Sequence, residues 1–189
     1  MEPSDVALLV VLGSADSGPA SVEEIVGVAR MMAPQDWHPT ADTIRLCAER
    51  AILKGLLQPV RCNGDIAHVA LETTPAGRAA IVELLRQPIG PSCGGYIRAC
   101  MSAKLCFLHH LPVAERQCDG EKLARLYRDA IRRLRRLKHS PPLVGSAWGE
   151  VRHEIVRMES ELAFLDGMRH RHPGEAKLGG GPRNGMQRP

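Results

Sequence analysis

Apolar positions recur at helical spacing along most of the chain. The first run, residues 6–12, predicts a short apolar helix that Gly13 ends. A second helix is predicted from "SVEEIVGVARMM", because Ser21 and Glu24 stand in capping-box register. Both segments precede residue 34, where a proline closes the second one.

The stretch "TADTIRLCAERAILKGLL" predicts a third helix that begins after Thr40, a good N-cap, and stops at Gly55. Its apolar positions share one face, and they are Ile44, Cys47, Ala48, Ala51 and Ile52. Three short helices are therefore expected within the first fifty-five residues.

Two β-leaning runs follow and flank Asn63-Gly64, a dipeptide that favours a tight hairpin turn. After them, Thr74 is placed to cap a helix whose first residue is Pro75. The predicted order is helix, helix, helix, hairpin, helix.

A cluster of prolines and glycines at residues 88–95 predicts a boundary between a domain at 1–90 and a helical domain at 91–170. The second domain carries two heptad-like stripes, the first at Leu123, Tyr127, Ala130, Leu134 and Leu137, and the second at Trp148, Val151, Ile155, Met158, Leu162 and Leu165. Two such helices bury little by themselves, so the second stripe is expected to hold a homodimer together. Residues 171–189, which include "LGGGPRNG", are expected to form a disordered tail.

Composition narrows the function classes. The chain is 44% hydrophobic and 24% charged, like an ordinary soluble protein, and its 3% aromatic content leaves few rings for stacking on single-stranded nucleic acid. No leader or membrane span is evident, so a cytoplasmic protein without a membrane partner is expected. Residues 1–90 hold 7 Lys+Arg against 11 Asp+Glu, and residues 91–189 hold 18 against 10.

Three helices followed by a hairpin form the winged helix-turn-helix arrangement, in which the third helix enters the major groove of double-stranded DNA and the hairpin touches the backbone. The fold class expected is mainly α with a small β-hairpin wing. Arg45 is the best candidate for a contact to guanine. The other expected DNA contacts are Thr40, Thr43, Arg50 and Lys54 on the third helix, and Arg61, Asn63 and His68 on the wing.

The segments "DTIRLCAERAILKGLL", "HVALETTPAGRAAIVELL" and "AKLCFLHHLP" together resemble the PadR-like transcriptional regulators, over roughly residues 5–168. The sharpest elements are Lys54-Gly55-Leu56 and Thr74-Pro75-Ala76-Gly77. The resemblance implies homodimers held by the C-terminal helices, repression of a nearby operon, and release by an effector, such as a small molecule, bound near the dimer interface. The order of elements and the heptad helices predict a dimer that reads a pseudo-palindromic operator.

Catalysis has little support in the sequence, which lacks GxSxG, HExxH and phosphate-loop motifs, so neither an enzyme nor a cofactor is expected. Cys100, Cys106 and His110 stand at spacings that allow metal or oxidant sensing. Packed thiols and a pair of helix-end histidines explain the same residues without any site.

The run "RLYRDAIRRLRRLK" holds most of the basic surplus. Its arginines 128, 132, 135 and 136 are expected opposite the leucine seam, either as a solvated face or as a surface for DNA or an acidic partner. The acidic front half leaves a rival function open, in which the winged-helix dimer has lost DNA binding and serves as an adaptor or antagonist of another regulator.

Overall fold

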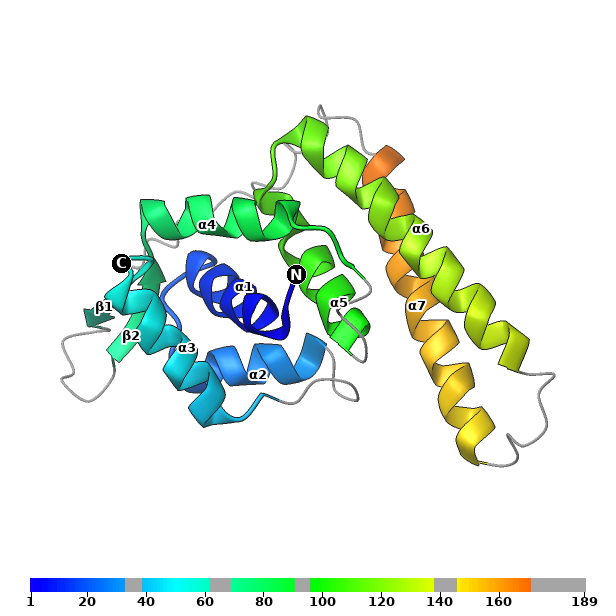
Figure 1. Ribbon diagram of the computed structural model, residues 1–189, viewed down its shortest axis with the longest axis horizontal. Coiled ribbons are helices and arrows are strands. Elements are labelled where there is room, and N and C mark those ends of the chain that lie inside the picture. The colour runs from blue at the N-terminus through cyan, green and yellow to red at the C-terminus, as the bar shows by residue number, and fades with distance from the viewer. Residues whose placement is uncertain (33–38, 62–68, 91–95, 138–145, 171–189) are drawn as a thin grey trace, which may run out of the picture. The chain divides into compact units, whose positions relative to one another are not determined.

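The computed structural model describes residues 1–32, 39–61, 69–90, 96–137 and 146–170 (Figure 1). Packing divides the chain into two compact units, Met1–Gly120 and Glu121–Pro189. The boundary expected at residue 90 is one between a DNA-binding and a dimerisation domain. It concerns function and stays a prediction, whereas the two units differ in packing. The expected tail at 171–189 lies outside the described residues.

Helix α1 (Pro3–Asp16) lies at the centre of the first unit (Figure 1). It contacts α2 (Val22–Met32), α3 (Ala41–Leu53), α4 (Pro75–Arg86), α5 (Ile97–Phe107) and strand β2 (Val69–Thr73). A helix surrounded in this way has apolar residues on all sides, which is why the run at residues 6–12 shows no polar face. Its fully buried side chains include Val6, Leu9, Val10, Val11 and Leu12.

The prediction that Gly13 ends the first helix is wrong, because α1 continues to Asp16. A Cβ atom at Gly13 would lie 2.8 Å from Cγ of Phe107 on α5. The glycine thus makes room for the aromatic ring and lets α5 pack closely on α1. The close approach comes from a residue 94 positions later, which local sequence does not show.

The predicted caps of the next two helices are confirmed. The amide of Glu24 donates to Oγ of Ser21 at 3.2 Å, and the amide of Ser21 donates to the Glu24 carboxylate at 2.7 Å. The amide and the hydroxyl of Ser21 both donate to the Glu24 carboxylate, and these two hydrogen bonds lower its pKa. Thr40 caps α3, since its Oγ1 accepts from the amide of Thr43 at 3.2 Å, and Gly55 follows α3 with a φ of +69°.

The described part of the wing is an antiparallel pair, β1 (Leu57–Arg61) with β2, in which Leu57 lies opposite Thr73 and Arg61 opposite Val69. Ala20 bridges the other edge of β2 through two backbone hydrogen bonds with Leu71, at 2.9 and 3.0 Å. The predicted turn at residues 63–64 lies outside the described residues. An uninterrupted ladder from a two-residue turn there would pair residue 61 with residue 66, which is not the observed register.

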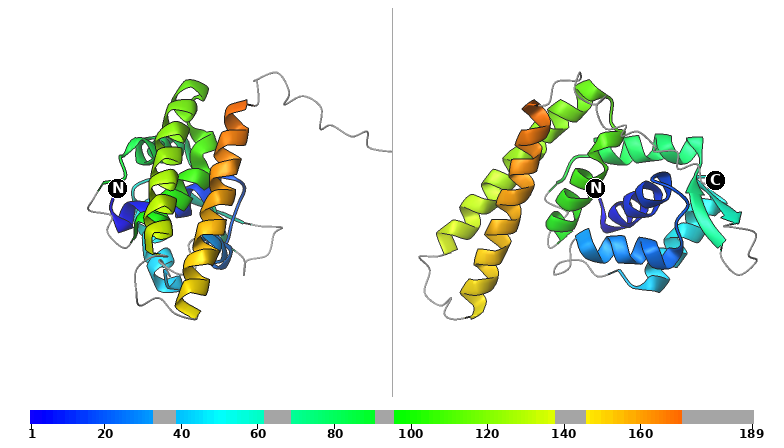
Figure 2. Two further views of the ribbon diagram at one scale, coloured as in Figure 1. Left: turned by 90° about the vertical axis from the view of Figure 1, so that its right-hand side faces the viewer. Right: turned by 180° about the vertical axis from the view of Figure 1, so that it is seen from behind.

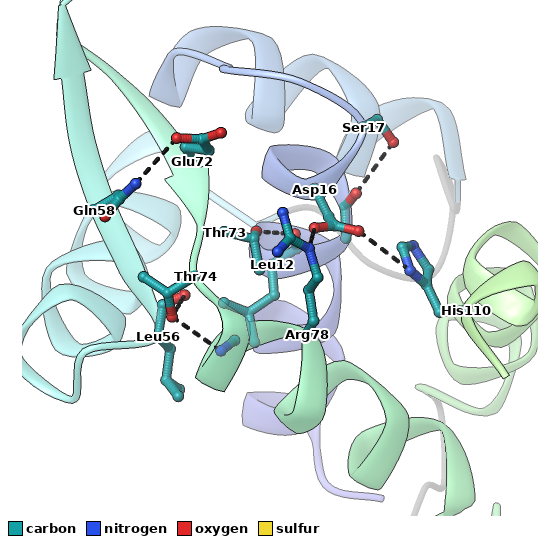
Figure 3. Close-up of polar contacts among 12 residues, drawn as sticks. Leu12, Asp16, Ser17, Leu56, Gln58, Glu72, Thr73, Thr74, Arg78 and His110 are labelled. Atoms are coloured by element: carbon teal, nitrogen blue, oxygen red, sulfur yellow. Dashed lines mark hydrogen bonds and ion pairs between the residues drawn. The ribbon is translucent and has the colours of Figure 1, made fainter.

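The junction between the wing and α4 is held by Thr74 (Figure 3). Its Oγ1 accepts from the amide of Gly77 at 3.1 Å and donates to the carbonyl of Gly55 at 2.7 Å. The hydroxyl therefore caps α4 and ties it to the end of α3, as the predicted N-cap requires. Thr73, one residue earlier, is buried and donates to the carbonyl oxygen of Leu12 at 2.7 Å.

After α5, a 3-10 turn labelled η2 (Leu108–His110) leads into α6 (Val113–Leu137). The first turns of α6 belong to the first unit. There the Glu115 carboxylate accepts two hydrogen bonds from the Arg86 guanidinium, each 2.8 Å long. This pair lowers the pKa of Glu115, because Arg86 favours its charged form.

The second unit contains the rest of α6 and α7 (Ser146–His170), which lie side by side and antiparallel (Figures 1 and 2). Arg128 pairs with Asp166 at 3.2 Å, and Arg135 pairs with Glu159 at 2.5 Å. The second pair lies seven residues later in α6 and seven earlier in α7, so the helices keep one register over a heptad. None of the helices in the described ranges has the length and hydropathy needed to cross a membrane.

The fold class expected from the sequence is confirmed: the described residues are mainly helical and include a small antiparallel pair of strands. The position of two arginines on α6 differs from the prediction. Arg128 and Arg135 do not lie opposite the seam but along its flank, where carboxylates of α7 neutralise them. Their partners belong to another helix, so the heptad pattern of α6 alone could not place them.

Candidate nucleic-acid interface

Helix α3 has one buried face and one exposed face. Ile44, Ala48 and Ala51 are buried, and α3 contacts α1, α2 and β1. The small side chains of the two alanines let α3 lie close to its neighbours. Every other residue from Asp42 to Lys54 is exposed or half-buried. The polar side of α3 is therefore available to a ligand, as the sequence predicted.

The centre of the exposed face is not basic. Asp42, Leu46, Glu49 and Leu53 follow one another at 4-3-4 spacing, offset by two residues from the buried stripe and hence about 200° around the helix from it. The side chains of Leu46 and Leu53 are 48% and 86% exposed. The part of α3 that points most directly away from the core thus carries two carboxylates and two leucines. We call these four residues the outer stripe.

The basic candidates flank the outer stripe on its two sides. Arg45 follows Ile44 by one residue, whereas Arg50 and Lys54 lie on the side that faces α1. The Arg45 guanidinium is 3.0 Å from the Asp42 carboxylate, and both side chains are exposed. An exposed pair at i, i+3 spacing is weak, so Arg45 can exchange Asp42 for another anion at little cost.

The two threonines of α3 are partly occupied by the helix itself. Thr40 caps the N-terminus, and its Oγ1 lies 2.9 Å from Oγ1 of Thr43. Both side chains are nevertheless exposed, and a hydroxyl can accept and donate at once. They can therefore reach a phosphate without giving up the cap.

A groove with a volume of about 260 Å³ separates the start of α1 from α3. Its cationic end is formed by Arg50 and Lys54, and Asp5 of α1 also lines it. Cys47 lies in the wall, and burial raises the pKa of its thiol although the two cations oppose that shift. The groove brings both cations to one side of α3, where they can face the same run of phosphates.

The wing is described only in part. Arg61 is the last residue of β1 and is paired with Val69, while Asn63 and His68 lie outside the described residues. Ala70 and Leu71 of β2 are buried. An exposed polar contact on the strands joins Gln58 to Glu72, 3.1 Å apart (Figure 3). The expected wing contacts to DNA stay predictions.

A charged cluster that the sequence did not predict joins Asp16, Arg78 and His110 (Figure 3). The Asp16 carboxylate accepts from Nε of Arg78 at 2.7 Å, and its other oxygen lies 3.4 Å from Nδ1 of His110. These three residues come from α1, α4 and η2, with 62 and 94 positions between Asp16 and the other two. No local pattern could have signalled contacts across such separations.

The environment of His110 favours the neutral imidazole. Burial lowers its pKa, and so do the nearby His109, Arg116 and Arg78, while Asp16 opposes the shift. The rings of His109 and His110 lie 4.1 Å apart. Within the described part of the chain, Nε2 of His110 is buried without a hydrogen-bond partner.

The residues of the hypothetical sensor are not gathered into one site. Cys100 is buried in the core and Cys106 is exposed, six residues later on the same helix. Among the residues that the structure describes, no three His, Cys, Asp or Glu side chains are grouped to hold a metal ion. Metal or oxidant sensing by Cys100, Cys106 and His110 stays a prediction.

The residues expected at the dimer interface lie on one stripe of α7. Met158 and Leu165 are buried within the chain itself, and the other four, Trp148, Val151, Ile155 and Leu162, are half-buried. On the opposite side of α7, Val156 and Phe164 are 59% and 50% exposed. Part of the predicted stripe is thus used inside the chain, and two large apolar side chains elsewhere on α7 stay exposed.

No family model and no curated protein matches the chain. Among solved structures, it is similar to Bacillus subtilis PadR in complex with operator DNA, with 14% identity, 86% of this chain and 95% of that chain covered, and a TM-score of 0.41. It is also similar to the same protein in complex with p-coumaric acid (16% identity, 88% and 98% covered, TM-score 0.41). A third similar structure is that of Bacillus subtilis PadR by itself, with 17% identity, 88% of this chain and 98% of that chain covered, and a TM-score of 0.40. All three come from the family that the sequence resembles.

Proposed function

We propose that the protein is a DNA-binding transcriptional regulator that uses α3 as its reading helix. One observation carries the proposal. Helix α3 follows two packed helices, precedes a hairpin, buries one narrow apolar stripe and leaves the rest of its surface open. This is the arrangement of a winged helix-turn-helix domain, in which the exposed face of the third helix lies in the major groove.

Each class of side chain on that face has a chemically suitable DNA group. Arg45 can donate two hydrogen bonds to guanine, and the carboxylates of Asp42 and Glu49 can accept from the amino group of cytosine. Leu46 and Leu53 offer apolar contact to thymine methyl groups. Arg50 and Lys54 at the groove beside α1 supply the charge for phosphates. The reading face is therefore suited to a specific site more than to bulk attraction.

We further propose a homodimer that reads a pseudo-palindromic operator and acts as a repressor. Two copies of α3 would contact half-sites about one helical turn apart, or a multiple of it. Dimer contacts would involve the α7 residues predicted from the heptad pattern together with Val156 and Phe164, whose exposed apolar surface supports an interface on α7. A small-molecule, metal or redox signal would release the operator.

The test is binding to DNA from upstream of the gene that encodes the protein. We expect a labelled duplex of that region to bind more tightly than a scrambled duplex, measured by fluorescence anisotropy. Substitution Arg45→Ala should weaken this preference by about 1–3 kcal/mol, as expected for loss of a bidentate base contact. The matched control is Arg152→Ala, an exposed arginine on α7. Equal affinities for both duplexes, unchanged by Arg45→Ala, would contradict the proposal.

A second function is supported by the outer stripe. Two carboxylates at the centre of α3 repel phosphates, and two exposed leucines suit a protein surface. The alternative is an adaptor or antagonist that binds another regulator through α3. It predicts that Leu46→Ser/Leu53→Ser abolishes capture of a protein partner, while no duplex binds even at low salt. Operator binding that survives in the double variant would contradict it.

A further inference from the structure

Almost all exposed side chains of α6 in the second unit are charged, and the exception is Leu137 at the end of the helix, which is 40% exposed. From Lys122 to Arg136, every side chain classed as exposed is charged, and none is apolar. These residues are Lys122, Arg125, Asp129, Arg132, Arg133, Arg135 and Arg136. The buried side chains of the same segment are Leu123, Ala124, Tyr127 and Ile131.

Most of these cations lie within one arc of the helix surface. Arg125, Arg132 and Arg136 recur at 7-4 spacing, which stacks them on one line along α6, and Lys122 and Arg133 lie beside that line. Tyr127, which is fully buried, points to the opposite side. We call the five cations the basic stripe. They share their arc with a single carboxylate, Asp129.

The ion pairs that the structure shows for α6 leave three arginines of the stripe without a carboxylate. Arg128 and Arg135 are neutralised by α7, but they lie outside the stripe on the flank of the helix. Within the stripe, Arg132 is 3.6 Å from Asp129. Arg125, Arg133 and Arg136 form no ion pair with any residue in the described ranges. Two guanidinium groups of the row, Arg125 and Arg136, and that of Arg133 beside it therefore keep their charge available.

The absence of exposed apolar side chains on this segment indicates which kind of partner the stripe fits. The buried core of a protein interface is apolar and poor in charged residues, so a protein partner would need apolar contacts that this surface does not offer. A nucleic-acid backbone needs only cations at suitable spacing. The row from Arg125 to Arg136 is roughly 16 Å long, which is long enough to face more than one phosphate of a strand.

We propose that the basic stripe of α6 is a second, sequence-independent contact surface for the phosphate backbone of double-stranded DNA. It supplies electrostatic affinity that the winged-helix domain lacks, since residues 1–90 carry four more acidic than basic side chains. In addition to the proposed function of α3, which determines sequence preference, the basic stripe would determine the affinity for DNA and its dependence on salt.

The test measures the affinity of the full chain for a 30-base-pair duplex of random sequence over a range of salt concentrations. The variant Arg125→Gln/Arg136→Gln should lower the slope of log K against log salt by about 2, one for each lost phosphate contact. At low salt, the affinity should fall by roughly tenfold or more. Thermal melting of the variant should stay that of the parent protein, because both side chains are exposed.

The matched control is Arg128→Gln/Arg135→Gln, which removes two arginines from the same helix and the same net charge. These cations already face Asp166 and Glu159, so the slope should change by less than one. Equal losses in the two double variants would overturn the proposal, because net charge alone would then explain them. Tighter binding to polyglutamate than to the duplex would also overturn the proposal, because the partner of the stripe would then be an acidic protein.

The experiments distinguish a failure of the stripe proposal from a failure of the regulator proposal. If Arg45→Ala removes operator preference while the stripe variant binds random duplex like the parent, the stripe inference is wrong and the regulator proposal stands. If the stripe variant loses random-duplex affinity and no duplex is preferred by the parent, the stripe inference stands and the regulator proposal is wrong.

Discussion

At the scale of single residues, Gly77 is required by a backbone contact. A Cβ atom there would overlap the carbonyl oxygen of Leu56 and lie 2.7 Å from Cγ2 of Thr73. Because backbone cannot move aside as a flexible side chain can, Gly77→Ala should lower the free energy of unfolding by about 1–3 kcal/mol. Chemical denaturation followed by circular dichroism measures this change.

Gly27 provides the control for that substitution. It lies inside α2, and a Cβ atom built there meets no other group within 4 Å. Gly27→Ala should therefore raise the free energy of unfolding by about 0.5–1 kcal/mol, since alanine favours helix more than glycine does. Equal destabilisation by both substitutions would show that the contact with Leu56 is not the cause.

The environment of His110 should make the free energy of unfolding depend on pH. Burial lowers its pKa in the folded chain, so the unfolded chain binds more protons than the folded chain between the lowered pKa and the ordinary value of about 6.5. The free energy of unfolding should therefore fall as the pH is lowered through this window. His110→Gln should flatten the dependence, which is measured by chemical denaturation at several pH values.

At the scale of elements, the two phenylalanines of the chain test how α5 is held. Phe107 is 5% exposed and lies against Gly13 of α1, whereas Phe164 on α7 is 50% exposed. Phe107→Ala should lower the free energy of unfolding by about 3–5 kcal/mol, because it empties a packed contact between two helices. Phe164→Ala should change the stability of the isolated chain by far less. Similar losses in the two variants would show that α5 is not anchored at Phe107.

At the scale of the whole molecule, the exposed Val156 and Phe164 of α7 predict self-association. Two exposed apolar side chains eight residues apart on one helix suit a second copy of the chain. The double variant Val156→Ser/Phe164→Ser should raise the dimer dissociation constant by about tenfold or more. Sedimentation equilibrium measures it, and a parent chain that stays monomeric at tens of micromolar would contradict the prediction.

Much of the winged-helix order could be predicted because its signals are local. Thr40, Ser21 and Thr74 each cap a helix through an amide three residues later, and Gly55 needs only its own backbone conformation. The exposed face of α3 also follows from the spacing of its apolar residues. The centre of that face is occupied by the outer stripe, Asp42, Leu46, Glu49 and Leu53, which the sequence analysis did not predict. The candidate cations lie on the two sides of this stripe.

The sequence by itself determined where most of the described helices begin, because caps, turns and periodic burial act over three to seven residues, although α1 continues past its predicted end at Gly13. Tertiary structure alone decided which residues from distant segments meet. Gly13 accommodates Phe107, Asp16 joins Arg78 to His110, and the arginines of α6 divide into those that α7 neutralises and those that stay available. Such pairings depend on how whole elements pack, and no spacing within one element encodes them.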